Sequence, residues 1–97
     1  MTYQKTWGNW VEGEVDGYRF QAKVFDEGSE YGINGGRISK LWMAKILEPW
    51  MTTGGAIIEY DRGWSTADGE EADEELILAT VPEEARIAYK KIVAEFR

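Results

Sequence analysis

Cysteine and histidine are both absent from the 97 residues of this chain. Without cysteine there is no disulfide framework, no thiolate zinc site and no thiol nucleophile. Without histidine the chain lacks the commonest neutral metal ligand and the usual proton shuttle near neutral pH. Only carboxylates, Lys, Tyr, Ser and Thr remain for acid–base or nucleophilic chemistry. Most familiar active-site designs are excluded, so we expect neither an enzyme, nor a metal site, nor a bound cofactor.

Long apolar runs are missing too. The start, MTYQKTWGNW, has no apolar signal region, and no stretch approaches the roughly eighteen apolar residues of a membrane span. The sequence therefore predicts a cytoplasmic protein without membrane contact. Basic residues are also few: 11 Lys and Arg against 18 Asp and Glu give a net charge of −7. That balance opposes binding to duplex nucleic acid, whereas a basic partner surface or a ligand in a local basic pocket stays open.

Length and composition predict a single domain over residues 1–97. A chain of this size sustains one core, and 43% apolar residues with 13% aromatic residues supply the material to fill it. We expect an α+β fold with a four-stranded antiparallel sheet in meander order over about 7–64. An acidic link should follow over 65–79, and then a C-terminal helix over about 81–96, packed on one face of the sheet.

The clearest local signal is Asp16-Gly17, which separates two alternating runs. This dipeptide predicts a two-residue type I′ hairpin with arms at 10–15 and 18–25. Placing Val15 opposite Tyr18 sets the register and divides the side chains between two faces. The core face then holds Val11, Gly13, Val15, Tyr18, Phe20 and Ala22, and the other face holds Glu12, Glu14, Arg19 and Gln21.

Two more strands are predicted after the hairpin. The Gly-rich segment 26–36 reads as a loop that needs positive φ at several points, and RISKLWMAKIL then begins a strand at Arg37. Ile38 and Leu41 cannot share one face of a regular strand, so we expect a β-bulge. After the connection at 48–55, AIIEYDRGW predicts a fourth strand.

The C-terminal segment predicts a helix. Its apolar residues from Ala85 to Phe96 follow helical spacing and form one stripe. Thr80 with Glu83 matches a capping box, and Pro82 suits the first helical turn.

Two segments concentrate groups that could bind an anionic, planar ligand. In 27–40 the Gly-rich turns expose backbone N–H groups, and Arg and Ser follow; in 60–64 two aromatic rings lie beside an Arg. Each segment also has a purely structural explanation, as a long loop or as a strand end fixed by an Asp–Arg pair. The candidate contacts are Arg37 and Arg62 for phosphate, the Gly35 and Gly36 backbone for an anion, Tyr31 and Trp64 for stacking, and Ser39, Lys40 and Asp61 for polar contacts. Tyr60 is a further candidate for ligand binding.

The two arginines provide a test of these alternatives. If both segments meet in space, Arg37 and Arg62 converge in an acidic protein, which would mark an anion site. We expect loss of Arg37 to weaken binding with little loss of stability. Loss of Arg62 should have a mixed effect, because Asp61 offers it a ready structural partner.

Five Trp residues are more than one small core needs, and the segment 68–75 is strongly acidic. The surplus Trp side chains favour a homo-oligomer or a partner complex, although a large core with partly exposed rings would explain them as well. The acidic segment is either a solvated face or a surface that docks on a basic groove.

The motifs GSEYGINGGRISKL at 28–41 and YDRGW at 60–64 resemble those of a family of small uncharacterised proteins from bacteria and their phages. The likeness covers about 10–64 and the last helix. The chain departs from the family pattern after Trp64, where Ser65 and a longer acidic segment replace an Asp and a shorter link. The family is a domain of unknown function, so the resemblance implies no activity. It does imply a phage-type context, in the host cytoplasm, where small acidic proteins inhibit bacterial immunity.

Two classes of function are consistent with these features. The leading hypothesis is a phage or prophage anti-defence protein that sequesters a small nucleotide-derived immune signal. The alternative is an acidic inhibitor, anti-CRISPR-like or DNA-mimicking, that uses 68–75 to block a nucleic-acid-binding bacterial defence protein. An enzyme would depend on Glu30 or Asp61 with Lys40 or Tyr60, and nothing in their spacing marks a catalytic pair.

Overall fold

A computed structural model describes residues 1–66 and 68–97 of the protein; Ala67, inside the predicted acidic link, lies outside them. The described residues form one antiparallel sheet with a C-terminal helix, so the predicted α+β class is confirmed. The sheet has six strands and not the predicted four. They are β1 (Thr2–Lys5), β2 (Trp10–Val15), β3 (Tyr18–Val24), β4 (Ile38–Glu48), β5 (Met51–Thr52) and β6 (Ile58–Asp61).

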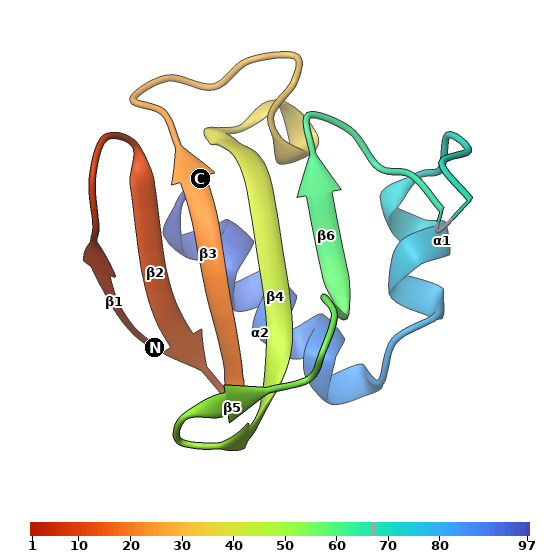
Figure 1. The fold of residues 1–97 in the computed structure, drawn as a ribbon. Helices are drawn as coiled ribbons and strands as arrows, with labels where there is room; N and C mark the ends of the chain where they lie inside the picture. The colour runs from red at the N-terminus through yellow and green to blue at the C-terminus, as the bar shows by residue number, and fades with distance from the viewer. Residues whose placement is uncertain (67) are drawn as a thin grey trace.

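The first five strands follow one another across the sheet, and β6 also pairs with β4 (Figure 1). The sequence-based prediction missed two strands, β1 and β5. All four residues of β1 are exposed, so it lacks the apolar alternation that marks a half-buried strand. β5 is only two residues long, and it pairs with the end of β4 through Ile46 and Glu48.

The predicted hairpin is confirmed. Val15 lies opposite Tyr18, Gly13 opposite Phe20 and Val11 opposite Ala22. Asp16 and Gly17 have φ values of 50° and 85°, as a type I′ turn requires.

The predicted bulge in β4 is confirmed as well. Opposite β3, Lys23 pairs with Lys40 and Val24 pairs with Ile38, so Ser39 is the extra residue on β4. This insertion brings Ile38 and Leu41 onto the same face, where both are buried. The loop before β4 has positive φ at Asn34 and Gly35, also as expected.

Besides the sheet, the described residues form two α-helices, α1 (Glu74–Ala79) and α2 (Glu83–Glu95). Ala88, Tyr89 and Ile92 of α2 are buried in the same core as Phe20 and Leu41 of the sheet, so α2 covers one sheet face (Figure 1). No helix among the described residues is long and apolar enough to cross a membrane.

The predicted capping box is wrong. Thr80 is the C-cap of α1, and its hydroxyl donates a hydrogen bond to the carbonyl of Ile77. Pro82 itself is the N-cap of α2 and makes no side-chain cap bond. The acidic link instead supplies the cap of α1, where the Asp73 carboxylate accepts the N–H of Leu76 at 2.8 Å.

Candidate functional site

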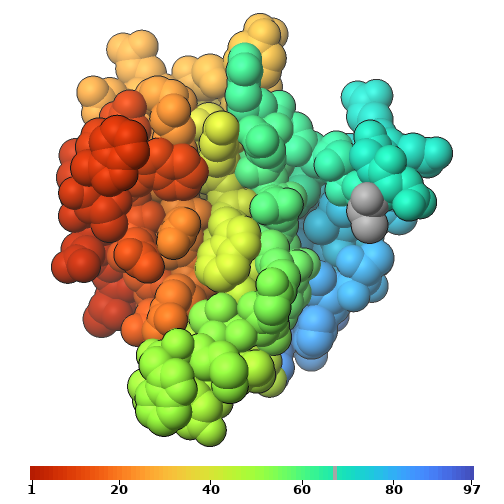
Figure 2. All heavy atoms as spheres, in the orientation of Figure 1, coloured from red at the N-terminus to blue at the C-terminus, as the bar shows by residue number. Residues whose placement is uncertain are grey.

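The sheet face opposite α2 carries several polar and aromatic side chains. Figure 2 looks onto this face, with β4 near its centre. In the β2–β3–β4–β6 register, Trp10, Lys23, Lys40 and Asp61 occupy successive positions across the strands. All four lie on the face away from the core, because their neighbours along each strand, such as Val11 and Leu41, are buried beneath α2.

At one end of this face is a hollow of about 370 Å³, here called the basic hollow. It is built from the end of β3, the loop before β4, the β4 bulge and the end of β6. Its lining residues are Lys23, Phe25, Ser29, Tyr31, Ser39, Lys40 and Arg62. Three cationic side chains therefore meet here in a protein whose net charge is −7.

Two aromatic rings position two of these cations. The guanidinium carbon of Arg62 lies 4.4 Å from the centre of the Tyr31 ring, and Lys23 Nζ lies 5.3 Å from that of Phe25. Both distances are within the range of cation–π attraction. The rings thus hold the charges at the hollow without neutralising them.

Asp61 pairs with Lys40 and not with Arg62. Lys40 Nζ lies 3.6 Å from Asp61 Oδ1, and both side chains are substantially exposed. Such exposed pairs contribute little, about 0–1 kcal/mol, so a stronger anionic ligand can compete for Lys40. Among the ion pairs in residues 1–66 and 68–97, none involves Arg62.

The backbone of Arg62 is held in the left-handed region, with a φ of 59°. A non-glycine residue there costs about 1–3 kcal/mol and persists only where its surroundings impose it. Here the Arg62 N–H donates a 2.8 Å hydrogen bond to the carbonyl of Ser39 in the β4 bulge. This hydrogen bond therefore holds Arg62 in a strained backbone conformation, with its guanidinium at the hollow. A glycine such as the next residue, Gly63, would adopt the same conformation at a lower cost.

Tyr60 fixes the loop that carries Tyr31. The buried Tyr60 hydroxyl donates a 2.7 Å hydrogen bond to the Tyr31 carbonyl. Burial raises the pKa of Tyr60, so the hydroxyl stays protonated and remains a donor. Trp64 packs edge-on against Tyr60, with ring centres 4.8 Å apart, and against Tyr89, at 5.8 Å. Tyr60 and Trp64 thus support the hollow from the core side.

Arg37 lies in a different place from Arg62. It lines a small hollow with Val93, Phe96 and Arg97. Its guanidinium donates hydrogen bonds to the Arg97 carbonyl at 3.2 Å and to the Phe25 carbonyl at 3.5 Å. These contacts give Arg37 a structural role, because they tie the C-terminal end to the start of β4.

The Gly35 and Gly36 backbone amides are also occupied. The Gly35 N–H donates to the Gly32 carbonyl and the Gly36 N–H to the Ile33 carbonyl, at 3.0 and 2.9 Å. Both donors close the loop and do not point to an open anion site.

Of the ten candidate residues, the structure therefore brings Tyr31, Ser39, Lys40 and Arg62 together in the basic hollow. Sequence reasoning missed Lys23, Phe25 and Ser29. A signal for Lys23 was available, because the hairpin register places it on the same face as Gln21. The same alternation extends to Phe25, the last residue of the predicted arm, whereas Ser29 lies in the loop, where no periodicity indicates a direction.

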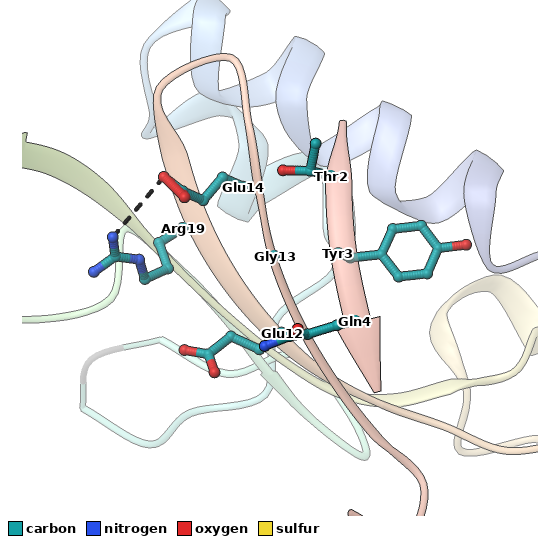
Figure 3. A pocket seen from close by; sticks show the side chains of 7 residues that line it. All are labelled: Thr2, Tyr3, Gln4, Glu12, Gly13, Glu14 and Arg19. Atoms are coloured by element: carbon teal, nitrogen blue, oxygen red, sulfur yellow. Dashed lines mark ion pairs between the residues drawn. The ribbon is translucent and has the colours of Figure 1, made fainter. Parts of the chain in front are cut away.

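A second hollow, of about 380 Å³, lies over β1, β2 and β3. Figure 3 shows Glu12, Glu14 and Arg19 on one side of it, while the Tyr3 ring points away. Arg19 is already engaged, with Nη2 3.8 Å from Glu14 Oε1 and 3.1 Å from the Pro49 carbonyl. One occupied cation between two carboxylates makes this a poor site for an anion.

The acidic segment is partly structural. Glu74 Oε2 accepts hydrogen bonds from the Tyr89 hydroxyl at 2.7 Å and from Asn34 Nδ2 at 3.1 Å. Burial, and then the bond to Glu74, raise the pKa of Tyr89, which keeps its hydroxyl a donor. Asp68, Glu70, Glu71 and Glu75 are exposed.

Within the described residues, no group of three or more acidic side chains is arranged to hold a metal ion. No curated protein and no solved structure matches the chain. A model of the family described as "Domain of unknown function (DUF7678)" matches residues 9–97, and the chain therefore belongs to that family.

Proposed function

We propose that this protein binds a small nucleotide-type ligand and does not transform it. In the phage anti-defence setting that the sequence resemblance implies, binding would sequester an immune signalling molecule. The ligand's phosphate occupies the basic hollow, where Lys23, Lys40 and Arg62 supply its counter-charges. Ser29 and Ser39 add short hydroxyl side chains at the same place.

One observation carries this proposal: three cations and two aromatic rings line one hollow of an otherwise acidic protein. Lys and Arg bind phosphate through charge-assisted hydrogen bonds, and exposed aromatic rings stack on planar bases. The strained backbone of Arg62 adds support, because such strain concentrates at binding sites. No cysteine or histidine is present for catalysis, which favours binding over chemistry.

Isothermal titration against AMP, ADP-ribose and cyclic nucleotides tests the proposal. We expect saturable binding of at least one of them, weakened as salt rises, because the hollow acts through charge. Ligand recovered from the heat-denatured complex should be unmodified. Flat heats across the whole panel would contradict the proposed nucleotide binding. A chemically altered ligand would show that the protein catalyses a reaction and does not only bind.

The alternative function, an acidic inhibitor of a nucleic-acid-binding defence protein, has its own observation. Asp68, Glu70, Glu71 and Glu75 are exposed together around α1. Replacing Glu70, Glu71 and Glu75 by Gln leaves the structural Glu74 in place. Nucleotide binding should be unchanged in this triple variant. If the variant instead lost inhibition of a defence nuclease while nucleotide titrations stayed flat, the alternative would be favoured.

A further inference from the structure

A further hollow, of about 280 Å³, adjoins the basic hollow on the open sheet face. We call it the Trp hollow. It is lined by Trp10, Gln21, Lys40, Leu41, Trp42, Glu59, Tyr60 and Asp61. Trp10 and Trp42 are both half-buried, so the sheet holds their orientation while part of each ring stays accessible. Such fixed, partly exposed rings suit stacking on a planar group.

Lys40 lines both hollows, so they form one continuous surface. Lys23 lies directly opposite Lys40 in the β3–β4 register, and Trp10 lies opposite Lys23 in the β2–β3 register. Trp42 is two residues beyond Lys40, which places it about 7 Å further along the same face. The two lysines therefore stand between the rings of Phe25 and Tyr31 on one side and the two Trp rings on the other.

The charged side chains of the two hollows determine which groups of a ligand each hollow can bind. Lys23, Lys40 and Arg62 make the basic hollow suitable for phosphate. The Trp hollow is bordered by the carboxylates of Glu59 and Asp61, which repel a phosphate but accept N–H groups from the edge of a base. A ligand that fills both hollows would place its phosphate at the lysines and a planar ring against Trp42.

From this arrangement we propose that the ligand class is a dinucleotide: two planar rings joined through a phosphate linkage. One ring lies against Tyr31 and Phe25, the linkage lies at Lys23 and Lys40, and the second ring stacks on Trp42. The inference rests on the proposed nucleotide-binding function and specifies its substrate class. Each ring stacked on an aromatic side chain contributes enough for about a tenfold gain in affinity.

The test compares two probes, AMP and the linear dinucleotide pApA, by isothermal titration. Wild-type protein should bind pApA at least about tenfold more tightly than AMP. Trp42→Leu should bring the affinity for pApA close to that for AMP and leave AMP binding unchanged. Trp50→Leu is the matched control, because Trp50 is exposed beside β5 and lines neither of these two hollows, whereas Trp7 lines an adjoining hollow with Trp10 and Gln21. Both affinities should stay as in the wild type.

Tryptophan fluorescence gives a second readout that needs no variant, since pApA should quench it more strongly than AMP at saturation. Equal affinity of the wild type for the two probes would overturn the dinucleotide class while leaving nucleotide binding intact. Equal losses for both probes in Trp42→Leu would also overturn it, because the single base of AMP would then occupy the place that the proposal assigns to the second ring. Binding of neither probe, nor of the wider nucleotide panel, would remove the proposed function itself.

Discussion

At the scale of single residues, the two arginines proposed from sequence as one anion site have different surroundings. Arg62 points its guanidinium at the basic hollow from a strained backbone, whereas Arg37 donates to two backbone carbonyls. The expectation that Arg37 contacts a ligand depended on its convergence with Arg62, and the structure assigns the two to different hollows.

Arg37→Ala should therefore reduce stability and leave nucleotide binding unchanged. The loss of its two hydrogen bonds should cost about 1 kcal/mol, which corresponds to a fall in Tm of about 4–8 °C in a domain of this size. Arg62→Gly is the paired variant. Relief of the left-handed strain offsets the lost cation–π contact, so Tm should hardly change, while affinity falls by about one to two decades.

Thermal melts and titrations of the two variants measure both effects. Weaker nucleotide binding by Arg37→Ala at an unchanged Tm would restore the role expected for it from sequence. Unchanged binding by Arg62→Gly would remove Arg62 from the site.

At the scale of secondary-structure elements, the segments that were predicted correctly are those whose apolar residues recur at a regular spacing along the sequence. The β2–β3 hairpin, the β4 bulge and the stripe of α2 each bury side chains at regular spacing. β1 could not be found in this way, because its four residues are all exposed, although its contact with β2 is local and spans only the turn at residues 6–9. That contact needs Gly13, since a Cβ at this position would collide with the Thr2 carbonyl oxygen and with Cα and Cβ of Tyr3.

The basic hollow was only partly predictable for a related reason. Its residues come from four separate segments, and only the motif residues around Tyr31, Lys40 and Arg62 stood out along the chain. The side on which a loop residue such as Ser29 projects depends on tertiary contacts, here the bond from Tyr60 to the loop.

One carboxylate links α1 to two other parts of the fold. Glu74 receives hydrogen bonds from α2 through Tyr89 and from the loop before β4 through Asn34. In Glu74→Ala the buried Tyr89 hydroxyl loses its acceptor, which should lower the free energy of unfolding by about 1–3 kcal/mol. Urea unfolding followed by tryptophan fluorescence measures the change.

Glu75→Ala is the matched control. Glu75 occupies the same first turn of α1 and is exposed, so both variants lose a similar helix-dipole contribution. Its stability should stay within about 0.5 kcal/mol of the wild type. Equal losses in the two variants would show that Glu74 acts through the helix dipole alone.

At the scale of the whole molecule, the exposed Trp residues fall at two separated places. Trp7 is 76% exposed in the turn between β1 and β2, and Trp50 is 79% exposed beside the start of β5. Trp10, Trp42 and Trp64 are half-buried. The surplus of Trp noted in the sequence is therefore divided between the open sheet face, the support of Tyr60 and these two exposed sites.

The β4–β5 hairpin is where we expect copies of the chain to associate. Leu47, Trp50 and Met51 are all exposed there, and Figure 2 shows this segment projecting beyond the rest of the sheet. Large apolar side chains grouped at an exposed tip are typical of protein interfaces. Two copies related by a twofold axis would cover both tips at once.

Sedimentation velocity at tens of micromolar protein tests this association. The wild type should sediment as an oligomer, and Trp50→Ser should shift it to monomer because the largest apolar side chain of the tip is lost. Trp7→Ser removes a Trp of nearly equal exposure from the β1–β2 turn and should leave the oligomer intact. A wild-type monomer at this concentration would contradict the homo-oligomer, and loss of association in Trp7→Ser alone would move the interface from the hairpin tip to the β1 side of the sheet.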